Sequence, residues 1–113
     1  MQKITEKVRS VLTELDSIYE MLCKNNTNPA MKAISQIMPE LNEIIMKLIS
    51  EIPYYRQLGV DLPEDVILAQ LQNLLEAFEQ SDTVMLADTL KYELTNTLQV
   101  YDEILVQLET ESQ

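Results

Sequence analysis

The chain has 113 residues, of which 46% are apolar and 24% are charged. This balance is typical of one globular domain and too apolar for a disordered chain. It contains one glycine and no histidine. A glycine-rich phosphate loop, a serine–histidine–aspartate triad and an imidazole metal site are therefore excluded. Nineteen acidic and eight basic residues give a net charge of −11.

The negative charge is concentrated in the second half of the sequence. Residues 63–113 carry eleven acidic residues and a single basic one, Lys91. Nucleic-acid phosphates and anionic lipid headgroups both require cations, so we expect neither nucleic acid nor a membrane as a partner. Two interpretations of the acidic half stay open: it keeps the protein soluble, or it faces a basic partner.

The sequence carries no recognisable targeting signal. Residues 2–10 lack the apolar core of a signal peptide, and the longest run of strongly apolar residues, 44–46, is far too short to span a bilayer. Cys23 is the only cysteine and cannot form an internal disulfide. We therefore predict a cytoplasmic protein in which Cys23 is a half-buried structural thiol.

Apolar residues recur at helical spacing through the first half of the chain. The first predicted helix covers about 2–24 and ends in a polar loop. Asn28-Pro29 is typical of a helix start and opens a second helix, which we expect over 29–52. Pro39 falls inside the second apolar stripe without changing its phase, so this helix is predicted to be kinked or split at Pro39. The two stripes consist of Ile4, Val8, Val11, Leu12, Leu15, Ile18, Tyr19 and Leu22, and of Ile34, Ile37, Met38, Leu41, Ile44, Ile45, Leu48 and Ile52.

The second half predicts two more helices after an irregular connection over residues 53–62. Gly59 suits the left-handed conformation that closes a helical turn. Pro63 in a first turn opens a third helix over about 63–80, and Ser81-Asp82 caps a fourth over about 83–109. The two stripes consist of Ile67, Leu68, Leu71, Leu74, Leu75 and Phe78, and of Ala87, Leu90, Leu94, Leu98, Tyr101, Ile104, Leu105 and Leu108.

Four amphipathic helices with short connections predict an all-α fold, an antiparallel up-and-down four-helix bundle formed as one domain over residues 1–113. The fourth helix is predicted to be longer than the third. Its overhang around Leu105 and Leu108 needs cover, either from the first two helices or from a second copy of the protein.

Carboxylates offer the only route to a metal site in this sequence. Glu40 and Glu43, together with Glu79 and Asp82, have the spacing of a magnesium-dependent nucleotide hydrolase of the all-α kind. However, Glu40 and Glu43 fall off the apolar stripe toward solvent, and Asp82 is expected to be a helix cap. We therefore assign no catalytic residue, no cofactor and no metal site.

Apolar residues outside the four stripes favour binding to another protein. One group lies in the connection, which is unusually apolar, and a second lies on the back of the fourth helix. The candidate partner-binding residues are Tyr54, Tyr55, Leu58 and Val60 in the connection and Met85, Tyr92 and Val106 on the fourth helix. For the connection, packing over the bundle end is the favoured interpretation and a docking surface the alternative.

The loop at residues 80–82 and the following run Met85-Leu-Ala-Asp-Thr-Leu-Lys-Tyr-Glu-Leu94 resemble a stretch found in small uncharacterised bacterial all-helical proteins, some of them flagellar or motility-associated. The size, acidity and helical character of the chain are also similar to those of flagellar and type III export chaperones. The resemblance implies a cytoplasmic, non-enzymatic binding protein. No diagnostic motif of those families is present, so no functional residue is transferred.

The sequence thus leads to three hypotheses. The first is a non-enzymatic helical bundle that acts by protein–protein interaction, as a chaperone or adaptor for a protein partner of unknown identity. The second is a self-associating structural module, a homodimer joined through the overhang of the fourth helix. The third is the carboxylate-metal nucleotide hydrolase, which the sequence disfavours.

Overall fold

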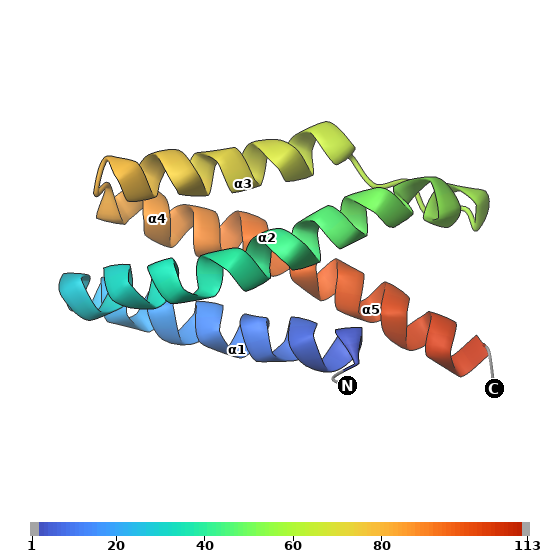
Figure 1. The fold of residues 1–113 in the computed structure, drawn as a ribbon, viewed down its shortest axis with the longest axis horizontal. Helices are drawn as coiled ribbons and strands as arrows, with labels where there is room; N and C mark the ends of the chain where they lie inside the picture. The colour runs from blue at the N-terminus through green and yellow to red at the C-terminus, as the bar shows by residue number, and fades with distance from the viewer. Residues whose placement is uncertain (1–2, 112–113) are drawn as a thin grey trace.

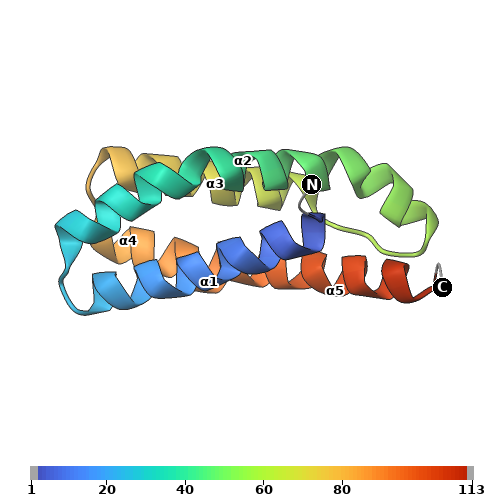
Figure 2. The ribbon, with the colours of Figure 1, turned by 60° about the horizontal axis from the view of Figure 1, so that its bottom comes forward.

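Four antiparallel helical rods make up the computed structural model, which describes residues 3–111 and the side chains of 3–109. The rods are α1 (Ile4–Cys23), α2 (Thr27–Gln57), α3 (Glu64–Glu79) and a last helix divided into α4 (Thr83–Asp88), η1 (Thr89–Leu94) and α5 (Thr95–Glu111). Successive rods reverse direction (Figure 1). Helix α1 packs against α2 and also beside the last helix (Figure 2). The prediction of an all-α, antiparallel four-helix bundle is confirmed.

The same capping geometry ends the first three rods. Asn25, Gly59 and Ser81 each follow a helix with a positive φ, of 61°, 88° and 54°. At each end the N–H of the next residue bonds back five residues; for example, the N–H of Val60 donates to the carbonyl of Tyr55 at 2.9 Å. This is a Schellman motif, which satisfies carbonyls left open at a helix end. The predicted left-handed conformation of Gly59 is confirmed.

Two helix starts test the predicted caps. Asp82 accepts a hydrogen bond from the N–H of Met85 at 3.1 Å, which confirms it as the cap of the fourth rod. Helix α2 begins at Thr27 after Asn26, so the prediction that Asn28 opens it was late by two residues. Residue 2, at which the first helix was expected to start, lies outside the described residues, as do residues 1, 112 and 113.

Helix α2 is longer than the sequence pattern indicated. It runs for 31 residues with Pro39 and Pro53 inside it, so it is not split at Pro39 and does not stop at residue 52. Each proline removes one backbone hydrogen bond. The helix continues because its buried face continues: Ile52 and Tyr55 on either side of Pro53 are 1% and 2% exposed. The connection expected over 53–62 is therefore confined to the residues after Gln57.

The two long rods extend beyond the two short ones at one end of the bundle. Helix α1 has 20 residues and α3 has 16, whereas α2 has 31. The overhang of the last helix lies near the end of α2 and the connection that follows it (Figure 2). Leu105 is buried there, while Leu108 is only partly buried. Val60 and Leu62 of the connection pack against the core, as the packing interpretation expected.

The last rod contains a π-helical turn that the sequence analysis did not predict. In η1 the backbone takes one residue more than a regular α-helix, and the Thr95 hydroxyl donates to the carbonyl of Leu90 at 2.6 Å. The buried apolar residues of this rod are Leu86, Leu90, Leu94, Leu98, Tyr101 and Leu105. The first four follow one another at intervals of four, which in a regular α-helix would drift by about 40° at each step. The extra residue in η1 removes this drift and returns Leu94 and Leu98 to the face of Leu86 and Leu90.

This turn accounts for one wrong assignment in the predicted core. Ala87 was predicted to belong to the fourth stripe, but Leu86 is fully buried and Ala87 is only partly buried. A helical period of about 100° per residue, applied backward from Leu94, does not include the extra residue of η1. It therefore assigns the wrong face of the first turn of the rod to the core. Cys23, expected to be half-buried, is exposed.

Candidate partner-binding groove

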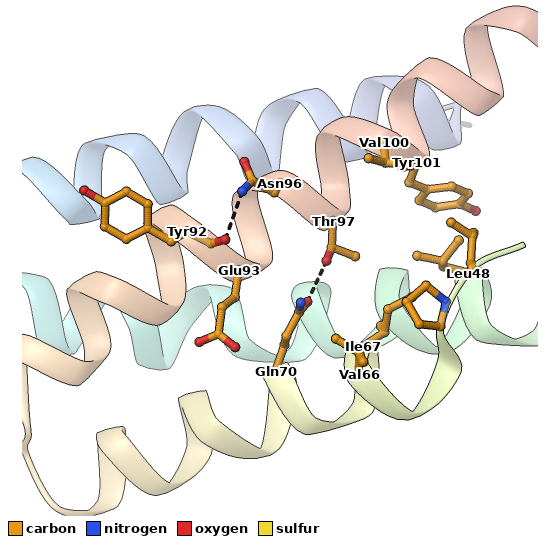
Figure 3. Close-up of a pocket in the computed structure, with 12 residues that line it drawn as sticks. Leu48, Val66, Ile67, Gln70, Tyr92, Glu93, Asn96, Thr97, Val100 and Tyr101 are labelled. Carbon is orange, nitrogen blue, oxygen red and sulfur yellow. Dashed lines mark hydrogen bonds between the residues drawn. The ribbon is translucent and has the colours of Figure 1, made fainter.

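A hollow of about 300 Å³ lies between α3 and the last rod, with α2 beneath it (Figure 3). Helix α3 contributes Val66, Ile67 and Gln70 to its lining, and α5 contributes Thr97 and Val100. The other lining residues are Leu48, Leu62, Pro63, Tyr92, Glu93, Asn96 and Tyr101. Glu93 is the only charged residue among them, Gln70, Asn96 and Thr97 are polar and uncharged, and apolar or aromatic side chains make up the rest of the lining.

Large apolar side chains at this hollow are exposed to solvent. Val66, Tyr92 and Val100 are 51%, 63% and 42% exposed. The Thr97 hydroxyl donates to Gln70 Oε1 at 2.6 Å and joins the two walls. Apolar side chains that face solvent along a groove are typical of a protein-binding surface. A bound apolar side chain would cover them.

A second hollow of about 300 Å³ continues along the same helix toward its C-terminal end. It is lined by Tyr55, Leu58, Val60, Ile104, Gln107 and Leu108. Residues 93, 97, 100, 104 and 107 are spaced by three or four, so one face of the last rod lines both hollows. We call the two hollows together the α5 groove. From residue 92 to 108 this face is roughly 24 Å long.

A polar cluster holds α5 against α2 between the two hollows. The Tyr101 hydroxyl donates to Glu51 Oε1 at 2.6 Å, and the Tyr55 hydroxyl donates to the same oxygen at 3.1 Å. The two tyrosine rings meet edge to face, with their centroids 6.5 Å apart. Lys47 Nζ lies 3.6 Å from the other oxygen of Glu51. The cluster fixes the position of the groove floor because both hydroxyls, on almost fully buried rings, depend on one carboxylate.

Both tyrosines of this cluster resist ionisation. Burial, followed by the Glu51 carboxylate, raises the pKa of Tyr55 from its ordinary value of 10.0 to about 12. Burial and the hydrogen bond to Glu51 also raise the pKa of Tyr101 well above its ordinary value. A negative phenolate beside a carboxylate in a buried place is unfavourable, so both hydroxyls remain protonated donors.

These pKa values predict a loss of stability at alkaline pH. Above pH 10 the unfolded chain releases the protons of Tyr55 and Tyr101 while the folded chain still holds them, so the free energy of unfolding falls as pH rises from 10 toward 12. Below pH 10 the two groups make no pH-dependent contribution. Urea unfolding at a series of pH values checks this. The Tyr55→Phe/Tyr101→Phe variant should show a shallower fall than the wild type, and equal slopes would contradict the prediction.

The predicted connection residues divide between the core and the second hollow. Tyr54 and Tyr55 lie on α2 and not in a loop. Tyr55 is 2% exposed, because its ring completes the core and its hydroxyl is held by Glu51; it lines the second hollow but offers a partner almost no surface. Leu58 and Val60 both line the second hollow, and Leu58 is 51% exposed. Tyr54 is exposed and lies outside both hollows.

The predicted back face of the fourth helix does not form one surface. Met85 is partly buried and packs against the core, whereas Tyr92 is exposed and lines the first hollow. The reason is η1, which begins after Met85 and includes Tyr92, so that its wider turn rotates Tyr92 relative to Met85. Val106 is 37% exposed and is not part of the lining of either hollow.

Sequence reasoning missed Val66, Val100 and Ile104 as groove residues. Ile104 was assigned to the core stripe, and it does lie at the stripe edge, partly buried. Val66 and Val100 are single apolar residues outside the stripes, and such residues are common on surfaces. One signal in the sequence could have indicated them. Val66 lies near the start of the short third helix, and Val100 and Ile104 lie where the longer fourth helix extends beyond it.

The carboxylates considered for a hydrolase do not form a metal site. Among the described residues, no group of three or more aspartate, glutamate, cysteine or histidine side chains is placed to hold a metal ion. Asp82 is engaged as a helix cap, and Glu43 lies 4.0 Å from Lys7 Nζ. A separate hollow of about 540 Å³ between α2 and α3 is lined by Ser35, Met38, Pro39, Asn42, Leu71, Leu75, Phe78 and Glu79. It contains one carboxylate and none of the most exposed apolar side chains.

Comparisons with known proteins give a family and no activity. No helix within the described residues has both the length and the apolar character needed to cross a bilayer. No curated protein and no solved structure matches the chain. The family model described as "Domain of unknown function (DUF8042)" matches residues 1–104. The match spans nearly all of the chain, including the first three rods and most of the last one, and the chain therefore belongs to the DUF8042 family.

Proposed function

We propose that this protein is a non-enzymatic binding module of the cytoplasm that takes a helix of another protein into the α5 groove, in the manner of a small chaperone or adaptor. The observation that carries the proposal is the row of exposed apolar side chains, Val66, Tyr92 and Val100, along an apolar hollow. Helix-in-groove recognition uses apolar anchors repeated along one face of the bound helix. The two hollows in line along α5 match that arrangement.

The resemblance to export chaperones is consistent with this proposal. It rests on the run 85–94 together with size, acidity and helical content. Residues 85–94 include Tyr92 and Glu93, which line the first hollow. No residue of the resemblance acts as an acid, base or nucleophile in the proposal. A homodimer is the alternative, in which a second copy covers the overhang around Leu108.

A pull-down with matched surface variants tests the proposed function. The Val66→Ser/Val100→Ser variant removes two exposed apolar groups from the groove. The control variant, Val84→Ser, changes the same residue type at a site that is 72% exposed and lies outside the groove. We expect the wild type and the control to capture the same protein from the native cytoplasm and the groove variant to lose it.

Two outcomes would contradict the proposed function. Equal capture by all three baits would place the binding surface elsewhere. A pull-down that recovers only further copies of this chain, together with a dimer mass in light scattering, would favour the self-associating module. Far-UV circular dichroism of each bait checks that the substitutions leave the helices intact, so that lost capture reports the groove.

A further inference from the structure

We infer that the segment bound in the α5 groove is a basic amphipathic helix, with apolar anchors on one face and lysine or arginine beside them. The inference rests on the proposed function and adds the chemistry of the partner. It is carried by the charge of the two walls and by the spacing of the two hollows.

The two helices that form the walls of the first hollow carry almost no positive charge. The other wall of the second hollow is the end of α2 and the connection, where Arg56 is paired with Asp61 at 3.4 Å. Helix α3 has four acidic residues and no basic one, and the last rod from Thr83 to Glu111 has six acidic residues and only Lys91. Lys91 faces α1: its Nζ lies 3.9 Å from Asp16 Oδ1 and 5.4 Å from the centre of the Tyr19 ring. The only cation of these two helices is thus directed away from the groove.

Two carboxylates are positioned to meet a basic partner. Glu93 lines the first hollow, and Glu103 is exposed one turn after Val100 and one turn before Gln107. Within the described residues, neither forms an ion pair with a basic side chain of the chain itself. Apolar anchors in the hollows would therefore be accompanied by cations at these carboxylates, which gives specificity and faster association.

The spacing of the hollows sets the spacing of the anchors. The residues of the last rod that line the first hollow centre near position 97, and those that line the second centre near 106. Nine residues of helix correspond to roughly 14 Å, or between two and three turns. A bound helix that runs along α5 would therefore place apolar residues about seven to eleven positions apart into the two hollows.

The same charges disfavour the other occupants of the groove. A second copy carries −11 as well, so two acidic surfaces would face each other. Anionic membranes and nucleic acids meet the same repulsion. A positively charged helix is the occupant that gains from both the apolar and the acidic features of the site.

Three synthetic peptides of about 18 residues, each carrying a fluorophore, test the inference by fluorescence anisotropy. The first is a leucine/lysine sequence with one apolar helical face, and the second has glutamate in place of lysine. The third has the composition of the first in an order without an apolar face. We expect the first to bind about tenfold or more tightly than the other two. We also expect its affinity to fall when the salt concentration is raised from 50 to 300 mM.

Matched charge variants test whether the carboxylates at the groove attract the leucine/lysine peptide. Glu93→Gln/Glu103→Gln should weaken binding of the leucine/lysine peptide and flatten its salt dependence. Glu14→Gln/Glu20→Gln on α1 changes the net charge by the same amount at exposed sites away from the groove and should leave the affinity almost unchanged. Equal weakening by the two pairs would mean that only net charge matters and would overturn the inference.

The failure of this inference can be told apart from the failure of the proposed function. If the leucine/glutamate peptide binds as tightly as the leucine/lysine peptide, and Val66→Ser/Val100→Ser weakens both, the groove binds helices but the inferred charge of the partner is wrong. If the groove variant changes the affinity of neither peptide, both the proposed function and the inference fail. Equal binding of the scrambled peptide would reveal charge attraction without a groove and would overturn the inference.

Discussion

Deletion of Gln99 is expected to abolish cooperative folding, whereas deletion of Tyr92, seven residues earlier, is expected to leave a folded bundle. The two positions lie on the same rod and both are exposed. They differ because Tyr92 belongs to η1, which already contains one residue more than a regular helix, and Gln99 belongs to regular α-helix. The predicted difference follows from the geometry of the rod alone.

Removal of Tyr92 converts the π-helical turn into α-helix. The buried apolar residues of the rod then follow one another at alternating intervals of four and three, the regular pattern of a helix packed in a bundle. Tyr92 is 63% exposed, so little packing is lost. We expect the free energy of unfolding to change by less than about 1.5 kcal/mol.

Removal of Gln99 rotates part of the rod by about 100°. If η1 keeps its shape, Tyr101 and Leu105 leave the core; if η1 relaxes to α-helix, Leu94 and Leu98 leave it. Each lost core side chain costs about 2–5 kcal/mol. A total stability of about 5–15 kcal/mol does not tolerate the loss of two.

Urea unfolding followed by far-UV circular dichroism measures both deletions. The account predicts a cooperative transition for the Tyr92 deletion and a broad or absent one for the Gln99 deletion. A Tyr92 deletion that unfolds the chain as fully as the Gln99 deletion would contradict the assignment of η1 as the extra residue in an otherwise regular pattern.

The Tyr101→Ala substitution is expected to reduce the free energy of unfolding by about 3–5 kcal/mol. Tyr101 is fully buried, its ring packs against Tyr55, and its hydroxyl donates to Glu51. The substitution leaves a cavity under the groove and removes the contact that holds α5 to α2. Tyr101→Phe keeps the ring and should cost only about 1 kcal/mol, the net value of one hydrogen bond.

Tyr54→Ala serves as the control for this series. Tyr54 is 54% exposed and lies on α2 next to Tyr55, so its truncation should change stability by less than about 1 kcal/mol. Urea midpoints at neutral pH compare the three variants. If Tyr101→Ala and Tyr54→Ala lowered the midpoint equally, the polar cluster would not be an important support of the groove floor.

The bundle itself could be predicted because its signal is periodic and local. The stripes that include Leu15, Leu41 and Leu74 are at the helical period, and all three residues are fully buried. The predicted caps at Gly59 and Asp82 follow from the conformations that those residue types favour. Such features depend on a few neighbouring residues and need no knowledge of the tertiary contacts.

The groove could not be predicted in the same way. The hydrogen bond from Tyr101 to Glu51 joins residues 50 positions apart, and no local pattern pairs them. The predicted helix over 29–52 ends just before Pro53, yet in the structure burial of Ile52 and Tyr55 outweighs the hydrogen bond that this proline removes. The four-residue spacing from Leu86 to Leu98 indicates η1. The prediction did not use this spacing, because it assumed the rotation of a regular α-helix, about 100° per residue, along the whole rod.

The most direct test of the account is to locate a bound helix by NMR. Amide chemical-shift changes in the labelled protein, on addition of the leucine/lysine peptide, report which residues it contacts. The account predicts the largest changes on the two walls of the α5 groove, near Val66, Val100 and Ile104. Largest changes at the hollow between α2 and α3, near Leu75, or along the exposed face of α1 would contradict it.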